Sequence, residues 1–398
     1  MEETKKPAIR FDGFTEDWEL EKLEKHIIAF TDVTTENNQY PALTSSRKGI
    51  FLQTDYFAGH QIASADNTGY NIVPYGYFTY RHMSDDEVFH FNINDIIENG
   101  IVSTLYPVFT TDKELDSRYL QYQLNYGREF ARFAILQKQG GSRTYMYLNK
   151  LKQLFLTMPK RATEQKKISS FLLEADNLID MCQQEYDKLQ TFKKSMLEKM
   201  FPQNGAKVPE VRFAGFDGEW EFKKFGEVFE EYSEKNHDEL PALTIIQGLG
   251  TVRRDESGRS IQYDESGLKG YKLVRKGDFI VHLRSFEGGL EKANSTGIVS
   301  PAYHMFHGEG TDTRFFYAYL RSKQFIDVQL KPHVYGIRDG RSIDIAGMKT
   351  ILIPYPSLQE QQKIGDFLEK LDDLILSYQS ELEKLKNIKS ALLEKMFV

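Results

Sequence analysis

The stretch EQKKISSFLLEADNLID at residues 164–180 recurs as EQQKIGDFLEKLDDLIL at residues 360–376. The two copies align without a gap as far as the closing stretches SMLEKMF, residues 195–201, and SALLEKMF, residues 390–397. Apolar residues recur in them in steps of three and four, which is typical of a long amphipathic helix with a coiled-coil-like seam. A seam without a partner would be exposed to water, so the sequence predicts two long helices that pair with each other.

The seam also defines the side chains that we expect to mediate helix pairing or partner binding. They are Ile168, Phe171, Leu172, Leu178 and Leu189 in the first helix, and Ile364, Phe367, Leu371, Leu374 and Leu385 in the second. Each helix of about 38 residues is roughly 57 Å long, at about 1.5 Å per residue.

The repetition extends upstream of both helices. PAIRFDGFTEDWE from Pro7 matches PEVRFAGFDGEWE from Pro209, and the only two tryptophans of the chain are equivalent within it. PALT, GIVSTLYPVF and DSRYLQYQL of the first half match PALT, GIVSPAYHMF and DTRFFYAYL of the second, in the same order. Ordered matches of this kind indicate an internal duplication. The interiors, about 45–70 and 245–270, are nearly unrelated, so one frame carries two different inserts.

The expected fold class is α+β, as a pseudo-symmetric tandem duplication. Stretches such as KLVRKGDFIVHL alternate like short strands between glycine-bearing turns, whereas DTRFFYAYL is helical in pattern. The predicted parts are a first domain, a first long helix, a linker, a second domain and a second long helix. Their boundaries are 1–158, 159–201, 202–209, 210–355 and 356–398.

Composition excludes several classes of protein. The chain has 398 residues, a net charge of −7 and a single cysteine, Cys182, so neither an internal disulfide nor a cysteine-based zinc site is expected. No run approaches the roughly 20 apolar residues of a membrane span, and no apolar signal core precedes the first domain. We therefore expect a cytoplasmic protein that does not contact a membrane. The negative charge disfavours a strongly basic nucleic-acid binder but does not exclude local basic faces.

No motif for chemistry is present in the sequence. A Walker A motif, a G-x-G-x-x-G loop and the N/D-P-P-F/Y motif of amino-methyltransferases are all missing. His304 and His307 are three positions apart, but no carboxylate motif accompanies them. We therefore predict no catalytic residue, no metal ligand and no cofactor site in this chain.

Polar loops beside aromatic residues remain as candidates for nucleic-acid binding. Arginine, asparagine, glutamine and serine side chains at such places read base edges or contact phosphates. The candidates are Arg47, Lys48, Arg81, His82, Lys138, Arg143, Arg253, Arg254, Arg284, Tyr335, Arg338 and Arg341. Any one of them could instead be a solvated or ion-paired surface residue. As a set they favour DNA binding, because GGSRTY and GIRDGRS fall at equivalent places just before the two long helices.

The P-x-x-R-F-x-G-F…W openings, the EQ-x-K-I-x-x-F-L helix starts and the LEKMF closures together resemble the specificity subunit of type I restriction–modification enzymes. The resemblance covers essentially the whole chain. It implies two target-recognition domains, each of which reads one part of a split, asymmetric double-stranded DNA target, separated by two antiparallel helices. It also implies two modification (methyltransferase) subunits that carry S-adenosylmethionine, and restriction subunits with ATP-dependent translocase and nuclease activity. No catalytic residue is carried over, and the variable interiors allow no base-contacting residue to be carried over either.

Two other classes of protein stay open at this point. A pseudo-symmetric coiled-coil scaffold that binds protein, peptide or glycan would also combine similar helices with different interiors. An independent nuclease or methyltransferase is disfavoured by the missing motifs.

Overall fold

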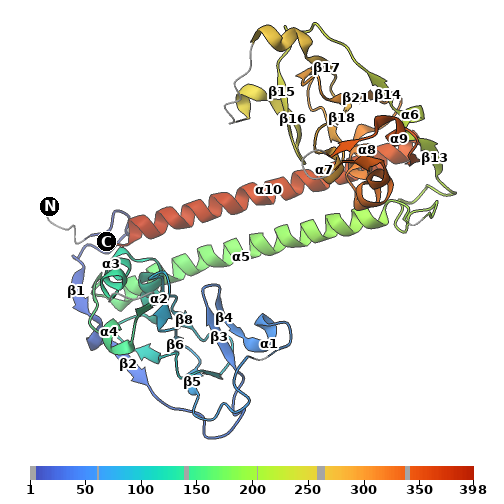
Figure 1. Cartoon of the computed structure of the whole chain (residues 1–398). Coiled ribbons are helices and arrows are strands. Elements are labelled where there is room, and N and C mark those ends of the chain that lie inside the picture. Colours follow the sequence, from blue (N-terminus) through green and yellow to red (C-terminus); the bar gives the residue numbers. More distant parts are fainter. Residues whose placement is uncertain (1–5, 61, 139–142, 204, 258–264, 337–340) are drawn as a thin grey trace. The chain divides into compact units, whose positions relative to one another are not determined.

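The computed structural model describes residues 6–60, 62–138, 143–203, 205–257, 265–336 and 341–398 (Figure 1). Its elements alternate between short strands and helices, and two helices are far longer than the rest.

The helices are α1 (Gln53–Tyr56), α2 (Ser117–Tyr126), α3 (Arg128–Leu136), α4 (Leu148–Leu151), α5 (Ala162–Lys199), α6 (Phe225–Val228), α7 (Ser285–Gly288), α8 (Thr313–Leu320), α9 (Ile345–Met348) and α10 (Leu358–Met396). Shorter 3-10 segments are η1 (Leu23–Lys25), η2 (Arg254–Glu256), η3 (Glu265–Gly270) and η5 (Lys331–His333), and η4 (Gln324–Leu330) is a π-helix.

The strands of the first half are β1 (Glu19–Lys22), β2 (Ile27–Phe30), β3 (Leu43–Ser46), β4 (Gly49–Leu52), β5 (Asn71–Pro74), β6 (Phe78–Thr79), β7 (Met83–Ser84), β8 (Asn92–Ile93), β9 (Asn99–Val102), β10 (Val108–Thr111), β11 (Thr144–Tyr145) and β12 (Phe155–Met158). Those of the second half are β13 (Glu221–Lys224), β14 (Glu230–Tyr232), β15 (Leu243–Ile246), β16 (Gly250–Arg253), β17 (Lys272–Val274), β18 (Phe279–Val281), β19 (Glu291–Lys292), β20 (Gly297–Val299), β21 (His304–His307), β22 (Val334–Tyr335), β23 (Ser342–Ile343) and β24 (Leu352–Tyr355).

Two compact units make up the chain, and the division between them passes through the long helices. The first unit is Met1–Cys182 with Glu381–Val398, and the second is Gln183–Ser380. Each unit therefore contains one globular domain and one half of each long helix, so the helices do not form a compact unit of their own. The α+β class predicted from the sequence is confirmed.

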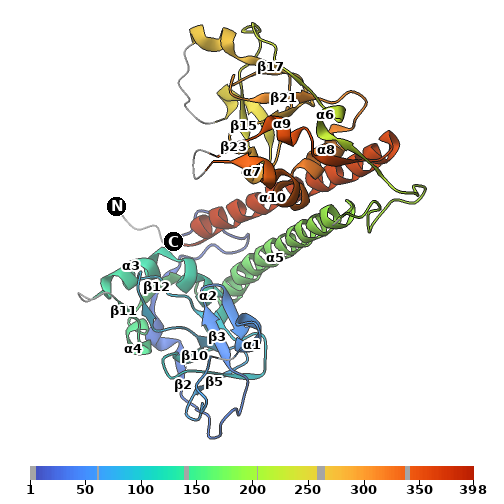
Figure 2. The same cartoon turned by 45° about the vertical axis from the view of Figure 1, so that its right-hand side comes forward.

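The two domains share one strand order. The first has an antiparallel four-stranded sheet in the order β2-β10-β6-β8, and the second has the order β14-β21-β18-β19. Two-stranded sheets β1–β12 and β13–β24 lie at the entrance to each long helix. In the second unit α8 lies beside α10 (Figure 2), and Arg314 of α8 bonds Glu369 of α10 at 3.0 Å. One difference follows α2 and α8, where the first domain has the α-helix α3 and the second has the π-helix η4.

An ion-paired clamp explains the repeated R-F…W and E-Q motifs. Arg10 donates from Nε and Nη2 to both carboxylate oxygens of Glu164, at 2.6 and 2.8 Å, and the Trp18 indole donates to Glu164 at 3.3 Å. Arg212 binds Glu360 in the same bidentate way, at 2.7 and 2.8 Å. Both glutamates are buried at the first turn of their helices, so each clamp ties a domain opening to the start of a long helix.

The glutamines that follow these glutamates hold a second helix in each domain. Gln165 accepts a hydrogen bond from the Asp116 backbone amide at 2.8 Å, and Gln361 accepts one from Asp312 at 3.0 Å. The two aspartates are the N-caps of α2 and α8, where their side chains accept backbone amides of the first turn. The E-Q pair thus positions both the domain opening and the helix that packs on the sheet.

The closing M-F motifs fill the core of the domain made by the other repeat. Met396 and Phe397 lie in the core of the first domain, where the Phe397 ring packs edge-on against Tyr119 at 5.9 Å. Met200 and Phe201 lie in the core of the second domain. Each domain is therefore completed by the end of the other repeat's long helix.

Ion pairs between the helices repeat in the same way. In the first unit Lys389 of α10 bonds Asp176 of α5, and in the second unit Lys193 of α5 bonds Asp372 of α10. These are equivalent positions of the two copies. Residue numbers fall along α10 as they rise along α5, so the pairing is antiparallel.

Candidate nucleic-acid interface

Three predicted cations of the first domain come from three separate segments. Arg47 is in the turn between β3 and β4, Lys138 follows α3, and Arg143 directly precedes β11. All three are exposed. Lys48, beside Arg47 in the same turn, is exposed as well.

Each of these three cations contacts one member of the triplet Asp85, Asp86 and Glu87, which follows β7. Arg143 donates from Nε to Asp85 at 2.9 Å, Arg47 pairs with Asp86, and Lys138 pairs with Glu87. The hydrogen bond from Arg47 holds the pKa of Asp86 below its usual range, so this carboxylate stays charged. The sequence reasoning singled out the cations and missed the acids.

A hollow of about 300 Å³ adjoins this cluster. Arg47, Arg81, Ser84, Asp85 and His90 are among the residues that line it. Arg81 is exposed at its edge. Cations around a concave surface suit phosphate or base contacts, and this is the part of the first domain where predicted residues converge.

His82 is buried below this surface. Its Nδ1 bonds the Leu105 carbonyl, and its ring stacks on Tyr147 at 5.0 Å. The imidazole is therefore not accessible to a duplex. Tyr145 and Tyr147, which stack on each other at 5.9 Å, are instead partly exposed, and sequence reasoning did not select them.

The candidate DNA-binding residues of the second domain lie in two places, at the end of β16 and around α7. Arg253 ends β16 and pairs with Asp255 at 3.0 Å, and Arg254 lies over the Tyr271 ring at 5.4 Å. Arg284 is exposed just before α7. Arg253 and Arg284 are therefore both at the surface of the second domain.

Arg341 lies beside α7. Its guanidinium contacts Glu287 at 3.0 Å and covers the Phe286 ring at 4.4 Å. This contact thus joins Arg341 to another element, although Asp344 is closer in the sequence. Tyr335 of β22 is 59% exposed. Arg338 lies outside the described residues.

The helix residues predicted from the seam divide into two groups. Ile168, Leu172, Ile364 and Leu371 are buried, and Leu189, Phe367 and Leu385 are partly buried. Phe171 is 38% exposed and packs edge-on against Phe11, whereas Leu178 and Leu374 are 54% and 44% exposed. These last two occupy equivalent positions of the two copies and point away from the seam.

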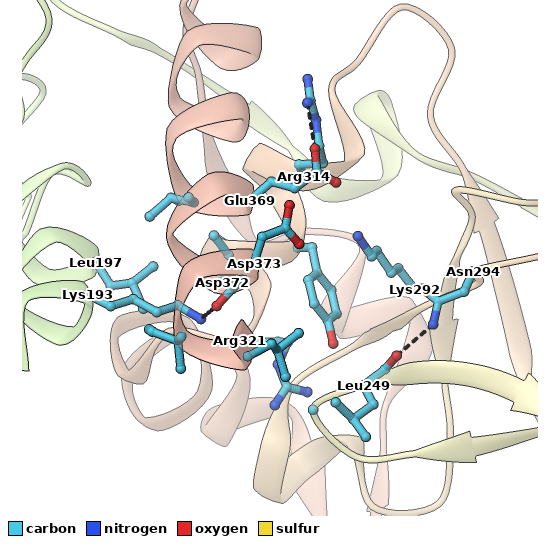
Figure 3. Close-up of a pocket in the computed structure, with 16 residues that line it drawn as sticks. Lys193, Leu197, Leu249, Lys292, Asn294, Arg314, Arg321, Glu369, Asp372 and Asp373 are labelled. Carbon is cyan, nitrogen blue, oxygen red and sulfur yellow. Dashed lines mark hydrogen bonds and ion pairs between the residues drawn. The ribbon is translucent and has the colours of Figure 1, made fainter. Parts of the chain in front are cut away.

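A cavity of about 530 Å³ lies in the second unit between α8, α10 and the β15–β16 turn (Figure 3). Its charged groups largely satisfy one another: Lys193 bonds Asp372, and Arg314 bonds Glu369 at 3.0 Å. Below it the fully buried Glu291 accepts hydrogen bonds from the backbone amides of Gly248 and Gly250 at 2.8 and 3.1 Å. These contacts of the lining and of Glu291 hold the β15–β16 hairpin and the long helices against the rest of the domain. The cavity is therefore better explained by packing of the domain than by a ligand.

Among the described residues, one group could hold a metal ion by its composition, namely His26, Asp112 and Glu114. His26 is buried and bonds Asp112 at 3.0 Å, whereas Glu114 is exposed. At the equivalent edge of the second domain the Phe229 ring lies where a Cβ on Gly308 would approach within 2.5 Å. The first repeat thus has a hydrogen-bonded polar pair at this edge, and the second has an aromatic ring against a glycine.

The two histidines that stand three positions apart in the sequence are engaged separately. His304 contacts Glu231 and His307 contacts Asp278, each at 2.7 Å. Each imidazole thus has its own carboxylate partner, and the two do not share one. Within the described part of the chain, no helix is both long and apolar enough to cross a membrane.

Known proteins share this architecture. Residues 217–387 match the type I restriction modification DNA specificity domain. The type I restriction enzyme MjaVIII specificity subunit of Methanocaldococcus jannaschii is 24% identical over 317 residues, which are 74% of this chain and 73% of that protein. The putative MjaX specificity subunit of the same organism is 22% identical over 312 residues, 70% of this chain and 67% of that protein.

A solved structure has the same fold over nearly the whole chain. The type I restriction–modification S subunit from M. genitalium superposes with a TM-score of 0.58 at 14% identity, over 99% of both chains. Residues 217–387 thus match the type I restriction modification DNA specificity domain, and the chain is similar over about 70% of its length to type I specificity subunits. These similarities favour DNA recognition over the alternative of a scaffold for peptide or glycan.

Proposed function

We propose that this chain reads a bipartite, asymmetric DNA target, with one domain for each half-site. The observation that carries the proposal is a shared frame with two unlike surfaces. Both domains have the same sheet order and the same clamp, but their cations stand on different loops with different partners. Two domains with the same framework but different exposed cations are suited to bind two half-sites of different sequence.

The proposal also assigns the chemistry to partner subunits. Modification subunits that bind S-adenosylmethionine would methylate the target, and restriction subunits would translocate and cut DNA in the cytoplasm. The chain itself would do neither. Incubating the pure chain with labelled S-adenosylmethionine and DNA tests this, because turnover would contradict the non-catalytic role.

Exchange of one domain should change half of the target. If residues 20–158 are replaced by the equivalent segment of another family member, the cut falls in the β1–β12 sheet and leaves the second domain untouched. Methylated sites would be mapped in cells that express the complex before and after the exchange. A new first half-site with an unchanged second one is expected.

The reciprocal exchange of residues 222–354, which cuts the β13–β24 sheet, serves as the matched control. It should change the other half-site alone. Changes in both half-sites after either exchange, in an assembled complex, would contradict one domain per half-site.

The equivalent exposed leucines Leu178 and Leu374 are the proposed docking points for two modification subunits. Leu178 lies three positions before Met181, which is 64% exposed, and contiguous exposed apolar surface marks protein interfaces. Leu178→Glu should remove one modification subunit from the complex, and the double variant with Leu374→Glu should remove both. Native mass spectrometry would count the subunits, with Gln184→Glu on an exposed polar helix position as control. Retention of both copies by the double variant would move the docking surface elsewhere.

A further inference from the structure

Three consecutive acidic residues hold three basic residues that are remote in the sequence. Asp85, Asp86 and Glu87, the acidic triplet, pair with Arg143, Arg47 and Lys138 across separations of 58, 39 and 51 residues. Their charges cancel, so this part of the first domain presents little net positive field despite its cations.

The central member of the acidic triplet, Asp86, is held in place by its surroundings. The buried Ser84 donates from Oγ to Asp86 at 2.8 Å, and the Val88 amide donates to the same oxygen at 3.3 Å. Arg47, Ser84 and Val88 therefore converge on one carboxylate oxygen. A carboxylate fixed by three donors occupies a position in which a phosphate oxygen could accept from the same arginine.

The second domain places an acid at the equivalent point. β6 and β18 both pair with the central strand of their sheets, through Phe78 with Phe109 and through Phe279 with Phe306. Asp85, which holds Arg143, follows Phe78 by seven positions, and Glu287, which holds Arg341, follows Phe279 by eight.

The partners of these acids also correspond. Arg143, held by Asp85, directly precedes β11, and Arg341, held by Glu287, directly precedes β23. The sequences between the phenylalanine and the acid, TYRHMS in the first domain and IVHLRSF in the second, are unlike. In both domains an acid thus pairs with the arginine that directly precedes a short strand, although the loops that supply the two acids are unlike.

We infer that the acidic triplet stands in for DNA phosphates on the free protein and thereby limits binding to DNA that lacks the target. This inference rests on the proposed function. A duplex of any sequence must displace the carboxylates from Arg47, Lys138 and Arg143, and it then faces three repelled negative charges. Only a correct half-site adds the base contacts that offset this cost, so the triplet raises discrimination rather than affinity.

Neutralising the triplet tests the inference. In the full-length chain, Asp85→Asn, Asp86→Asn and Glu87→Gln together should tighten binding to a mixed duplex without the target by roughly tenfold at about 0.1 M salt. The slope of log K against log salt should steepen by roughly two to three, because about 0.9 counterions are released per phosphate neutralised. Fluorescence anisotropy at several salt concentrations measures both quantities.

The matched control removes the same charge elsewhere. Glu19, Glu185 and Glu210 are exposed acids that pair with Lys160, Lys188 and Lys199. Replacing all three by glutamine should change affinity much less than the triplet variant does. An equal gain from both variants would show that net charge alone is responsible and would overturn the inference.

A coupling measurement separates competition from general repulsion. Glu87→Gln should tighten non-specific binding in the wild-type background and have little effect beside Lys138→Met, because the cation that it frees is then missing. An undiminished gain in the Lys138→Met background would contradict direct competition.

The cations themselves distinguish the inference from the function on which it rests. If Arg47→Met, Lys138→Met and Arg143→Met together leave DNA binding unchanged, this face is not an interface and the proposed site fails. If they weaken binding while the triplet variant does not strengthen it, the inference alone fails. Thermal unfolding of each variant checks that the first domain remains folded.

Discussion

Replacing Phe397 by alanine should destabilise the first domain by about 3 kcal/mol, although 278 positions separate it from Tyr119, which its ring contacts. The ring is only 7% exposed and lies with Met396 among the core residues of that domain. Truncation would leave a cavity that the surrounding aromatic side chains can only partly fill. Hydrogen exchange of backbone amides in β6 and β10, followed by mass spectrometry, would report the loss.

Phe201→Ala is the matched control, because Phe201 fills the second core in the same way. It should accelerate exchange in β18 and β21 and leave β6 and β10 unaffected. If Phe397→Ala instead loosens the second domain, or neither, the assignment of each closing motif to the opposite repeat's domain would be wrong.

Replacing Glu164 by glutamine should cost about 3 kcal/mol of unfolding free energy in the first unit. The Arg10 and Glu164 side chains are only 14% and 3% exposed, and both carboxylate oxygens are engaged by the guanidinium. Removing one charge of such a pair leaves the other buried without compensation, which is more costly than loss of an exposed ion pair. Urea unfolding followed by circular dichroism measures the change.

The double variant Arg10→Met, Glu164→Leu tests the cause. It removes both charges and retains apolar volume, so it should recover much of the stability that Glu164→Gln loses. Glu24→Gln, which breaks the exposed pair with Lys22, should cost far less. A double variant as unstable as Glu164→Gln would show that the stranded charge is not the main cause of the loss, since the glutamine can still accept the hydrogen bond from Trp18.

The sequence was informative about the helices because their signal is long and local. Steps of three and four over some ten turns, uninterrupted in the first copy, leave no other regular structure that buries the apolar face. The same pattern could not tell which leucines face the partner helix and which face outward. Leu178 and Leu374 fit the step pattern, but the helices pair along a neighbouring line of side chains, so both are exposed.

The candidate interface was less predictable because it depends on loops. Exposed arginines could be selected by residue type, yet Arg341 pairs with Glu287 on α7, an element that only the tertiary fold brings close. His82 was selected with Arg81, but neighbouring residues of an extended segment face opposite sides, so one is exposed and the other buried. The role of Asp85, Asp86 and Glu87 required knowledge of where three distant segments meet.

The exchange of closing motifs between the repeats has a consequence for the order in which the domains mature during translation. Chains are synthesised at about 5–20 residues per second and begin to fold from the N-terminal side. Phe201 is already made when synthesis of the second domain starts, but Phe397 follows 196 residues after it. The first domain therefore receives its last core side chains roughly 10–40 seconds after Phe201 has been made. The domain that is translated first therefore keeps an incomplete core until Met396 and Phe397 have been made.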